Sequence, residues 1–332
     1  MKEDYLWDRS GDADPEVERL ETLLGRYRHD APLRHERPPS RMWLAVAAAL
    51  FFALVAGGTL LALRFRWSSG AAWDVTSVTG APTIDGRVIT ANAQFALGEQ
   101  LCTNAASKAT VKIARIGVLD IAPSSCVRLV VTEEKQHRVF LARGSVAARV
   151  WAPPFTFAVR TPAGQANDIG CAFDLQYERG AGIVRVTSGW VDFDGVTRTA
   201  LIPAGAISEL REEPGTPFYP DANPGFIGAL RRFDAAHDAA SLHDLLRLAR
   251  TRDAMTLLHL LDHSDIYPQW RGALFDRLSA IAPPPPGVTR ADALRRDHER
   301  INAWRISLGL GGVKKWWLHW RDALPAKNGP AS

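Results

Sequence analysis

The sequence predicts a multi-domain membrane protein, with one transmembrane helix, a mainly-β domain and a C-terminal all-α helical domain. Three observations support this fold class. Residues 42–63 carry no charge and no proline. From residue 73 to 212, short runs of alternating apolar and polar residues are separated by Gly, Pro, Asn and Asp. After residue 225, apolar residues recur at the three- and four-residue spacings of helices.

The first of these segments, residues 42–63, has the length and composition of a membrane-spanning helix. Every side chain in it except Thr59 is apolar or Gly. A helix of this length rises roughly 33 Å, which is about the thickness of the bilayer hydrocarbon. A cleaved signal peptide would begin with a short charged segment, whereas 41 residues precede this one. We therefore expect an uncleaved transmembrane helix.

Arginine is unevenly distributed around this segment. Near its two ends, Arg26, Arg28, Arg34, Arg37 and Arg41 precede it, whereas only Arg64 and Arg66 follow it closely. Since loops rich in Lys and Arg stay in the cytoplasm, we expect a cytoplasmic N-terminus and an extracytoplasmic C-terminus. The formal net charge of +4 comes from interspersed residues, with no basic run that would indicate nucleic-acid binding.

Residues 1–41 form the expected cytoplasmic segment and contain a short amphipathic helix. Asp14 is placed to cap it and Pro15 suits its first position. The candidate partner-binding residues on its apolar face are Val17, Leu20, Leu24 and Tyr27. A short helix cannot bury such a stripe by itself, so it must lie on a membrane, self-associate or bind a partner. A loosely ordered tail is the other interpretation.

Residues 64–212 are expected to form the β domain. Its alternating runs cover residues 109–113, 118–121, 127–131, 139–141, 155–160, 173–177, 183–186 and 190–193. Their spacing is typical of an all-β sandwich or barrel-like module. Gly144, Gly170 and Gly189 are expected at strand junctions that need positive φ or a close backbone approach.

The chain has three cysteines, Cys102, Cys126 and Cys171. In an oxidising compartment one pair could be bridged, and Cys102 with Cys126 is the pairing we would expect. Three free or buried thiols fit the sequence equally well, because pairing cannot be read from spacing. The apolar context of Cys171 is typical of a buried, inert thiol.

Residues 213–225 are expected to be a linker, because turn-forming residues are concentrated there. They include Pro214, Gly215, Pro217, Pro220 and Pro224. The α-helical domain follows at 226–325. Its expected helices cover residues 226–236, 240–250, 253–262, 268–281 and 290–306, the last capped by Thr289.

The sequence offers little that indicates an enzyme. His259 and His263 share a helix face, as metal ligands do, but a third ligand is not evident. A nucleophile elbow and a phosphate-binding loop are also missing from the sequence. We therefore expect no enzymatic activity, no catalytic or metal-binding residues and no cofactor.

A family resemblance becomes visible between residues 98 and 205. The stretches that carry it are 97–101, 121–129, 139–146, 154–162, 168–173 and 184–191. Together they resemble the FecR domain of bacterial membrane-bound sensors, with Cys171 standing where that family usually has Thr. The resemblance implies an extracytoplasmic module that relays a signal to a cytoplasmic sigma factor.

These observations lead to one functional expectation and two alternatives. We expect a single-pass transducer in the bacterial inner (plasma) membrane, whose periplasmic FecR-like domain signals to an extracytoplasmic-function sigma factor. Its outer partner would be an unknown periplasmic or outer-membrane protein or an envelope ligand. One alternative is a passive envelope-binding or scaffolding module anchored by one helix. The other is an envelope hydrolase that uses His259 or His263.

Overall fold

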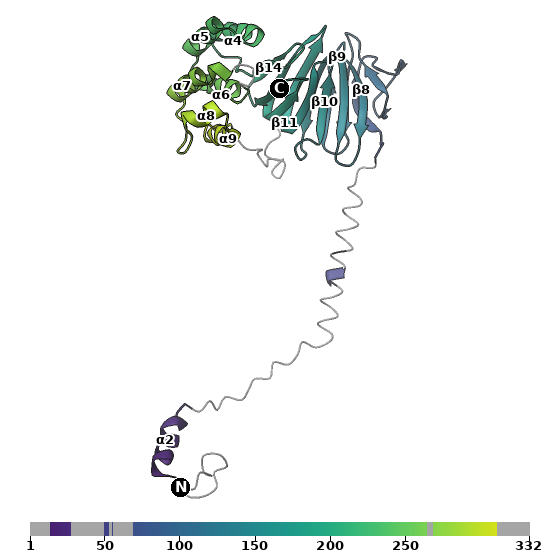
Figure 1. Ribbon diagram of the computed structural model, residues 1–332. Coiled ribbons are helices and arrows are strands. Elements are labelled where there is room, and N and C mark those ends of the chain that lie inside the picture. The colour runs from purple at the N-terminus through teal and green to yellow at the C-terminus, as the bar shows by residue number, and fades with distance from the viewer. Residues whose placement is uncertain (1–13, 28–49, 53–54, 56–68, 264–267, 311–332) are drawn as a thin grey trace, which may run out of the picture. The chain divides into compact units, whose positions relative to one another are not determined.

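The computed structural model describes residues 14–27, 50–52, 55, 69–263 and 268–310, and these fall into two units (Figure 1). The first unit is Met1–Phe65 and the second is Arg66–Ser332. In the first unit the described helix α2 covers Pro15–Gly25. The carboxylate of Asp14 accepts the backbone N–H of Glu16 at 2.9 Å, so the predicted cap is confirmed.

The expected fold class needs a correction at its first element. Most of the predicted transmembrane segment, residues 42–63, lies outside the described residues, apart from 50–52 and 55. None of the helices that the structure describes is long and apolar enough to cross a membrane. The part of the chain that the structure describes is therefore a large β domain followed by α-helices, with no transmembrane helix shown within it.

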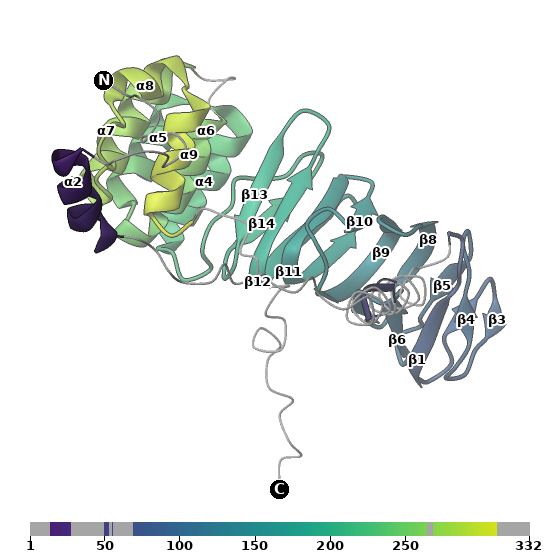
Figure 2. The ribbon, with the colours of Figure 1, turned by 90° about the horizontal axis from the view of Figure 1, so that it is seen from below.

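The second unit begins with a mainly antiparallel sheet of 14 strands. The strands are β1 (Trp73–Thr79), β2 (Thr83–Ile84), β3 (Arg87–Val88), β4 (Gln94–Phe95), β5 (Gln100–Cys102), β6 (Lys108–Ile113), β7 (Gly117–Ile121), β8 (Cys126–Thr132), β9 (His137–Val150), β10 (Phe157–Thr161), β11 (Gly164–Glu178), β12 (Ala181–Asp194), β13 (Thr199–Pro203) and β14 (Ile207–Leu210). All of them belong to one connected sheet. Strands β3 and β4 lie at one end, and β13 and β14 lie beside the helices (Figure 2).

Three long strands, β9, β11 and β12, organise this sheet. The first half of β11 pairs with β10 and its second half with β9, while β12 follows it along both halves. The register of β11 and β12 shifts between Ile169 and Ala172, next to Gly170. Each long strand contains one predicted junction glycine, Gly144, Gly170 or Gly189, with φ of 98°, 65° and 69°. The expected positive φ is confirmed, but the glycines bend continuous strands rather than separate them.

The β core is made by the inward side chains of these strands. Its largest fully buried members include Trp73, Phe95, Phe157, Phe173 and Phe193. Alternation of buried and exposed residues is clear in β6 and β7, as their sequences predict. Met255, which belongs to a helix, is part of the same buried cluster. The β core therefore continues into the helical region.

Six α-helices and two 3₁₀ turns make up the described part that follows the sheet. They are α4 (Pro224–Ala236), α5 (Ala239–Leu248), η1 (Thr251–Asp253), α6 (Ala254–Asp262), η3 (Pro268–Trp270), α7 (Arg271–Ile281), α8 (Arg290–Arg295) and α9 (His298–Ser307). The single helix expected at 290–306 is wrong, because Arg296 adopts a left-handed conformation with φ of 55°. Asp297 then starts α9 by accepting the N–H of Arg300. Thr289 caps α8 as predicted, in a reciprocal box with Asp292.

The segment between the sheet and α4, residues 211–223, is packed rather than extended through solvent. Phe218 exchanges both backbone hydrogen bonds with Ile207 of β14, at 2.9 and 3.0 Å. Phe218 and Tyr219 are buried, and Phe218 belongs to the helical core while Tyr219 belongs to the β core. This segment therefore joins the two cores side by side.

Candidate functional site

Helix α2 carries an exposed apolar surface. Leu20 and Leu24 are 55% and 62% exposed, and Tyr27 is 78% exposed. Val17 is half-buried and lies on the same face, one turn before Leu20. Tyr27 follows the end of the helix, and its backbone N–H donates to the carbonyl of Leu24 at 2.9 Å. The structure therefore brings Val17, Leu20 and Leu24 together and places Tyr27 just beyond them.

Sequence reasoning missed one member of this surface. Leu23 is 45% exposed and lies beside Leu20 and Leu24. Its i, i+3 spacing from Leu20 is the signal that could have found it. None of the 11 residues of α2 is buried by the described part of the chain. Leucines exposed to this extent on one helix suit an apolar groove in a partner.

His259 and His263 are also brought together, but they are packed as neutral rings. Their rings stack with centroids 4.1 Å apart. Nδ1–H of His263 donates to the carbonyl of His259 at 3.0 Å, and the hydroxyl of Thr199 in β13 donates to Nε2 at 3.0 Å. Burial lowers the pKa of both histidines, that of His259 most strongly. Among the described residues, no three His, Cys, Asp or Glu side chains are placed to hold a metal ion.

A second buried polar pair, Asp168 and Cys171, lies at the bend of β11. Oδ1 of Asp168 accepts the thiol of Cys171 at 2.5 Å and its backbone N–H at 2.8 Å. Oδ2 accepts the N–H of Gly170 at 3.2 Å. Burial raises the pKa of Asp168 to about 7. Because the same burial raises the pKa of the Cys171 thiol well above its ordinary value, this cysteine stays a protonated, unreactive donor.

A cleft of about 830 Å³ lies between β14, the segment that follows it and helix α4. Its lining includes four arginines, and three of them pair with carboxylates of the protein, Arg179 with Glu178 at 3.7 Å among them. Arg231 donates to Glu209, and Arg198 donates to Asp234. The positive charge available for an anionic ligand is reduced accordingly. We therefore interpret the cleft as part of the polar contact between the β and helical parts rather than as a binding site for an anion.

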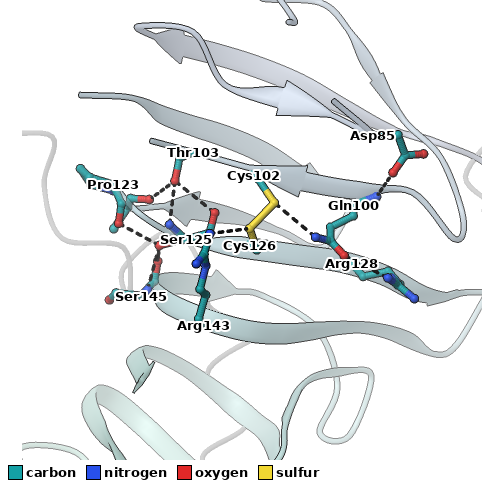
Figure 3. The surroundings of a disulfide bond; sticks show 11 residues. Asp85, Gln100, Cys102, Thr103, Pro123, Ser125, Cys126, Arg128, Arg143 and Ser145 are labelled. Atoms are coloured by element: carbon teal, nitrogen blue, oxygen red, sulfur yellow. Dashed lines mark hydrogen bonds between the residues drawn. A yellow bond between two sulfur atoms is a disulfide. The ribbon is translucent and has the colours of Figure 1, made fainter. Parts of the chain in front are cut away.

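The cysteine question is settled by the structure. Cys102 of β5 and Cys126 of β8 form a disulfide, and Cys171 is free and buried. Figure 3 shows the bridge beside a set of hydroxyl groups that tie neighbouring strands together. The hydroxyl of Thr103 donates to the carbonyl of Ala122 at 2.6 Å, and that of Ser125 donates to the carbonyl of Ser145 at 3.1 Å. The expected pairing is confirmed.

Comparison with known protein families identifies the β domain. Residues 99–192 match the family described as FecR protein. This region carries a FecR domain. The matched region runs from β5 to β12 and so contains the disulfide, the Asp168–Cys171 pair and the three bending glycines. The resemblance expected from the sequence is confirmed, and the FecR domain indicates a signalling or regulatory protein.

Two solved structures are similar to part of the chain. Both are described as a "putative anti-sigma factor" from Parabacteroides distasonis, determined at 1.65 and 2.50 Å resolution. Each is 16% identical, with a TM-score of 0.33 over 39% of this chain. The similar region spans 63% and 62% of those two chains, which is less than two thirds of their length. No curated protein matches the chain.

Proposed function

We propose that the chain regulates a sigma factor, and that its FecR domain receives the signal that sets this regulation. The FecR match across residues 99–192 supports the regulatory role. The exposed apolar face of α2 is the observation on which the proposed contact with a sigma factor rests. A sigma factor of the extracytoplasmic-function kind is the partner that the family resemblance implies.

Helix α2 is the proposed contact with the sigma factor. Leu20, Leu23 and Leu24 give it a continuous apolar stripe, while Glu16 and Glu18 lie in its first turn. Acidic residues there stabilise the helix through its dipole, so the stripe can be presented before binding. A short helix gains most of its stability by burying such a stripe, which makes partner binding favourable.

The FecR domain works outside the cytoplasm in this proposal, and α2 works inside it. The disulfide between Cys102 and Cys126 supports the first placement, because bridges persist in oxidising compartments and are rare in the cytoplasm. The protein acts by binding rather than by catalysis. The neutral His259–His263 stack and the protonated Cys171 both support that part of the proposal.

The test is capture, by the full-length chain, of extracytoplasmic-function sigma factors purified from the same organism. Leu20→Asp and Leu24→Asp should each weaken capture by at least about tenfold, because a carboxylate would enter an apolar groove. Thr22→Asp is the matched control, since it adds the same charge on the opposite side of the helix and should bind normally. Undiminished capture by both leucine variants would rule out this contact.

A further inference from the structure

The Cys102–Cys126 disulfide joins two strands that are already neighbours. Cys102 lies directly opposite Cys126 in the antiparallel pair of β5 and β8, with the two Cα atoms 4.2 Å apart. Backbone hydrogen bonds flank this position, from Thr103 to Ser125 and from Leu129 to Glu99. Alternation along an antiparallel ladder makes the cysteine pair a non-hydrogen-bonded one, in which side chains approach closely. The bridge therefore adds a covalent link to an existing contact.

The bridge lies on the outer side of the sheet. Its neighbours Leu101 and Val127 point to the opposite side and are fully buried in the β core. Cys126 is 6% exposed, whereas Cys102 is half-buried and can be reached from solvent. The two cysteines thus differ in exposure, and we expect a bulky thiol to reach Cys102 first.

Each sulfur atom has a side-chain donor beside it. Nε2 of Gln100 donates to Sγ of Cys102 at 3.3 Å, and Nη2 of Arg143 donates to Sγ of Cys126 at 3.9 Å (Figure 3). A cation next to a sulfur stabilises the thiolate over the thiol. In thiol–disulfide exchange, the sulfur that forms the more stable thiolate leaves faster. Arg143 therefore favours Cys126 as the leaving sulfur.

We propose that this bridge is a thiol–disulfide exchange site for an external dithiol, attacked at Cys102 and opened with Cys126 as the leaving thiolate. A thiolate of the dithiol forms a new bond to Sγ of Cys102, and the S–S electron pair moves to Sγ of Cys126. The second thiol of the reagent then attacks its own sulfur in the mixed disulfide and releases Cys102. The dithiol becomes a disulfide, and the protein gains two electrons and, from solvent, two protons.

Opening the bridge acts on a small part of the sheet. Strand β5 is three residues long and is the strand through which the β2–β3 hairpin joins β8. After exchange, the pairs Gln100–Arg128 and Leu101–Val127 and the Thr103–Ser125 hydrogen bonds still hold β5. We therefore expect only the β2–β3 hairpin and its junction with β5 to loosen, while the rest of the domain stays folded. This inference concerns an input to the FecR domain and does not depend on the sigma-factor contact.

The first test follows exchange in the folded full-length chain. The protein is incubated with excess dithiothreitol without denaturant, quenched with an alkylating reagent and mapped by mass spectrometry. Cys102 and Cys126 should become labelled, while Cys171, which is 1% exposed, stays unlabelled until the protein is unfolded. Labelling of Cys102 and Cys126 only when Cys171 is also labelled would show that global unfolding opens the bridge, and would overturn the proposal.

The second test assigns the two sulfur atoms. With each rate divided by the fraction of thiolate, which the pH dependence of the reaction gives, the free Cys102 of Cys126→Ser should react with an aromatic disulfide reagent at least about tenfold faster than the free Cys126 of Cys102→Ser, because Cys102 is more exposed. Equal rates, or a faster Cys126, would contradict attack at Cys102. Circular dichroism of both variants checks that each remains folded.

The third test concerns Arg143. Arg143→Gln should slow reduction of the bridge by about threefold or more, since the leaving thiolate loses its cation. Arg149→Gln is the control, because it removes the same charge from the same strand and pairs with Asp120 rather than with sulfur. Equal reduction rates in the two variants would show that Arg143 plays no part in the exchange. They would also contradict the assignment of Cys126 as the leaving sulfur.

Discussion

Nη2 of Arg198 lies 3.2 Å from Oδ1 of Asp234, and this ion pair connects the turn between β12 and β13 to helix α4. Both side chains are less than one fifth exposed, at 19% and 17%. Asp234 also accepts the hydroxyl of Thr216 at 2.6 Å and its backbone N–H at 2.8 Å. One carboxylate thus ties together the sheet, the connecting segment and the first helix of the helical part.

Removing that carboxylate should destabilise the protein. Asp234→Ala leaves Arg198 partly buried without its partner, and the free energy of unfolding should fall by roughly 2–4 kcal/mol. Denaturant unfolding measures the change. Asp244→Ala is the control, because Asp244 pairs with Arg232 at an exposed site and should cost about 1 kcal/mol or less. Equal losses in the two variants would contradict the role given to Asp234.

Gly189 should not tolerate a side chain. Its φ is 69°, and a Cβ there would lie 2.1 Å from the carbonyl oxygen of Gly170 on the paired strand. Gly189→Ala should therefore cost more than the roughly 1 kcal/mol expected from the left-handed conformation alone. Gly180→Ala has a similar φ of 80° and open space around it, so it measures the conformational part. Thermal unfolding of the two variants, compared with the unchanged protein, gives the difference.

Asp168 should make stability depend on pH. Its pKa is raised to about 7 by burial, from an ordinary value of 3.8, so folding favours the protonated acid. The resulting stabilisation is fully present below about pH 4 and is lost as pH rises through 7. In Asp168→Asn the side chain stays neutral, so this contribution should vanish. The measurement is the free energy of unfolding of both proteins from pH 4 to 8. The difference between the two values should change most steeply between about pH 4 and 7.

A buried histidine should act in the opposite direction. Burial lowers the pKa of His137 to about 4, where its ring packs edge-on against Trp73 with centroids 5.9 Å apart. Its contribution to stability is present above the ordinary pKa of 6.5 and is lost as pH falls toward 4. His137→Gln should flatten the acid side of the stability profile. An unchanged acid side in this variant would show that other groups cause the loss.

Much of the β domain could be predicted from the sequence, because alternation and turn residues are local signals. The runs at 109–113, 118–121 and 127–131 coincide with β6, β7 and β8. The joining of 183–186 and 190–193 into one strand, β12, could not be predicted. Gly189 lies between these runs and resembles a turn, but it bends a strand whose pairing with β11 continues on both sides.

The helical part was predicted less completely. Caps at Asp14 and Thr289 were visible, since an acceptor before a helical run is a local feature. The break at Arg296 could not be predicted, because residues 290–306 contain no Gly or Pro that would signal the end of a helix. Asp297 caps α9, and Arg296 donates to the carbonyl of Asp262, so a contact with α6 decides where the helix is interrupted.

The candidate sites also divide into those that local sequence patterns reveal and those that depend on tertiary contacts. The α2 stripe needs only helical spacing, and Val17, Leu20 and Leu24 were found. The Cys102–Cys126 bridge depends on which strands pair, and the sequence left free thiols as an equal alternative. The roles of Arg143 beside Cys126 and of Asp168 beside Cys171 depend on distances across strands and bends, which no sequence pattern reports.

The hydrogen-bonded strands from β8 through β9, β11 and β12 to β13, together with Met255 in the β core, form one body with a mechanical consequence. Bending such a body at any point would break several ladder bonds at once and open a gap between the sheet and α6. A force applied to the helices should therefore rotate the sheet and the helices together as one rigid body, with little internal change of shape. The β2–β3 hairpin is the part that can move, because it joins the sheet only through β5, which has three residues and acts as the hinge.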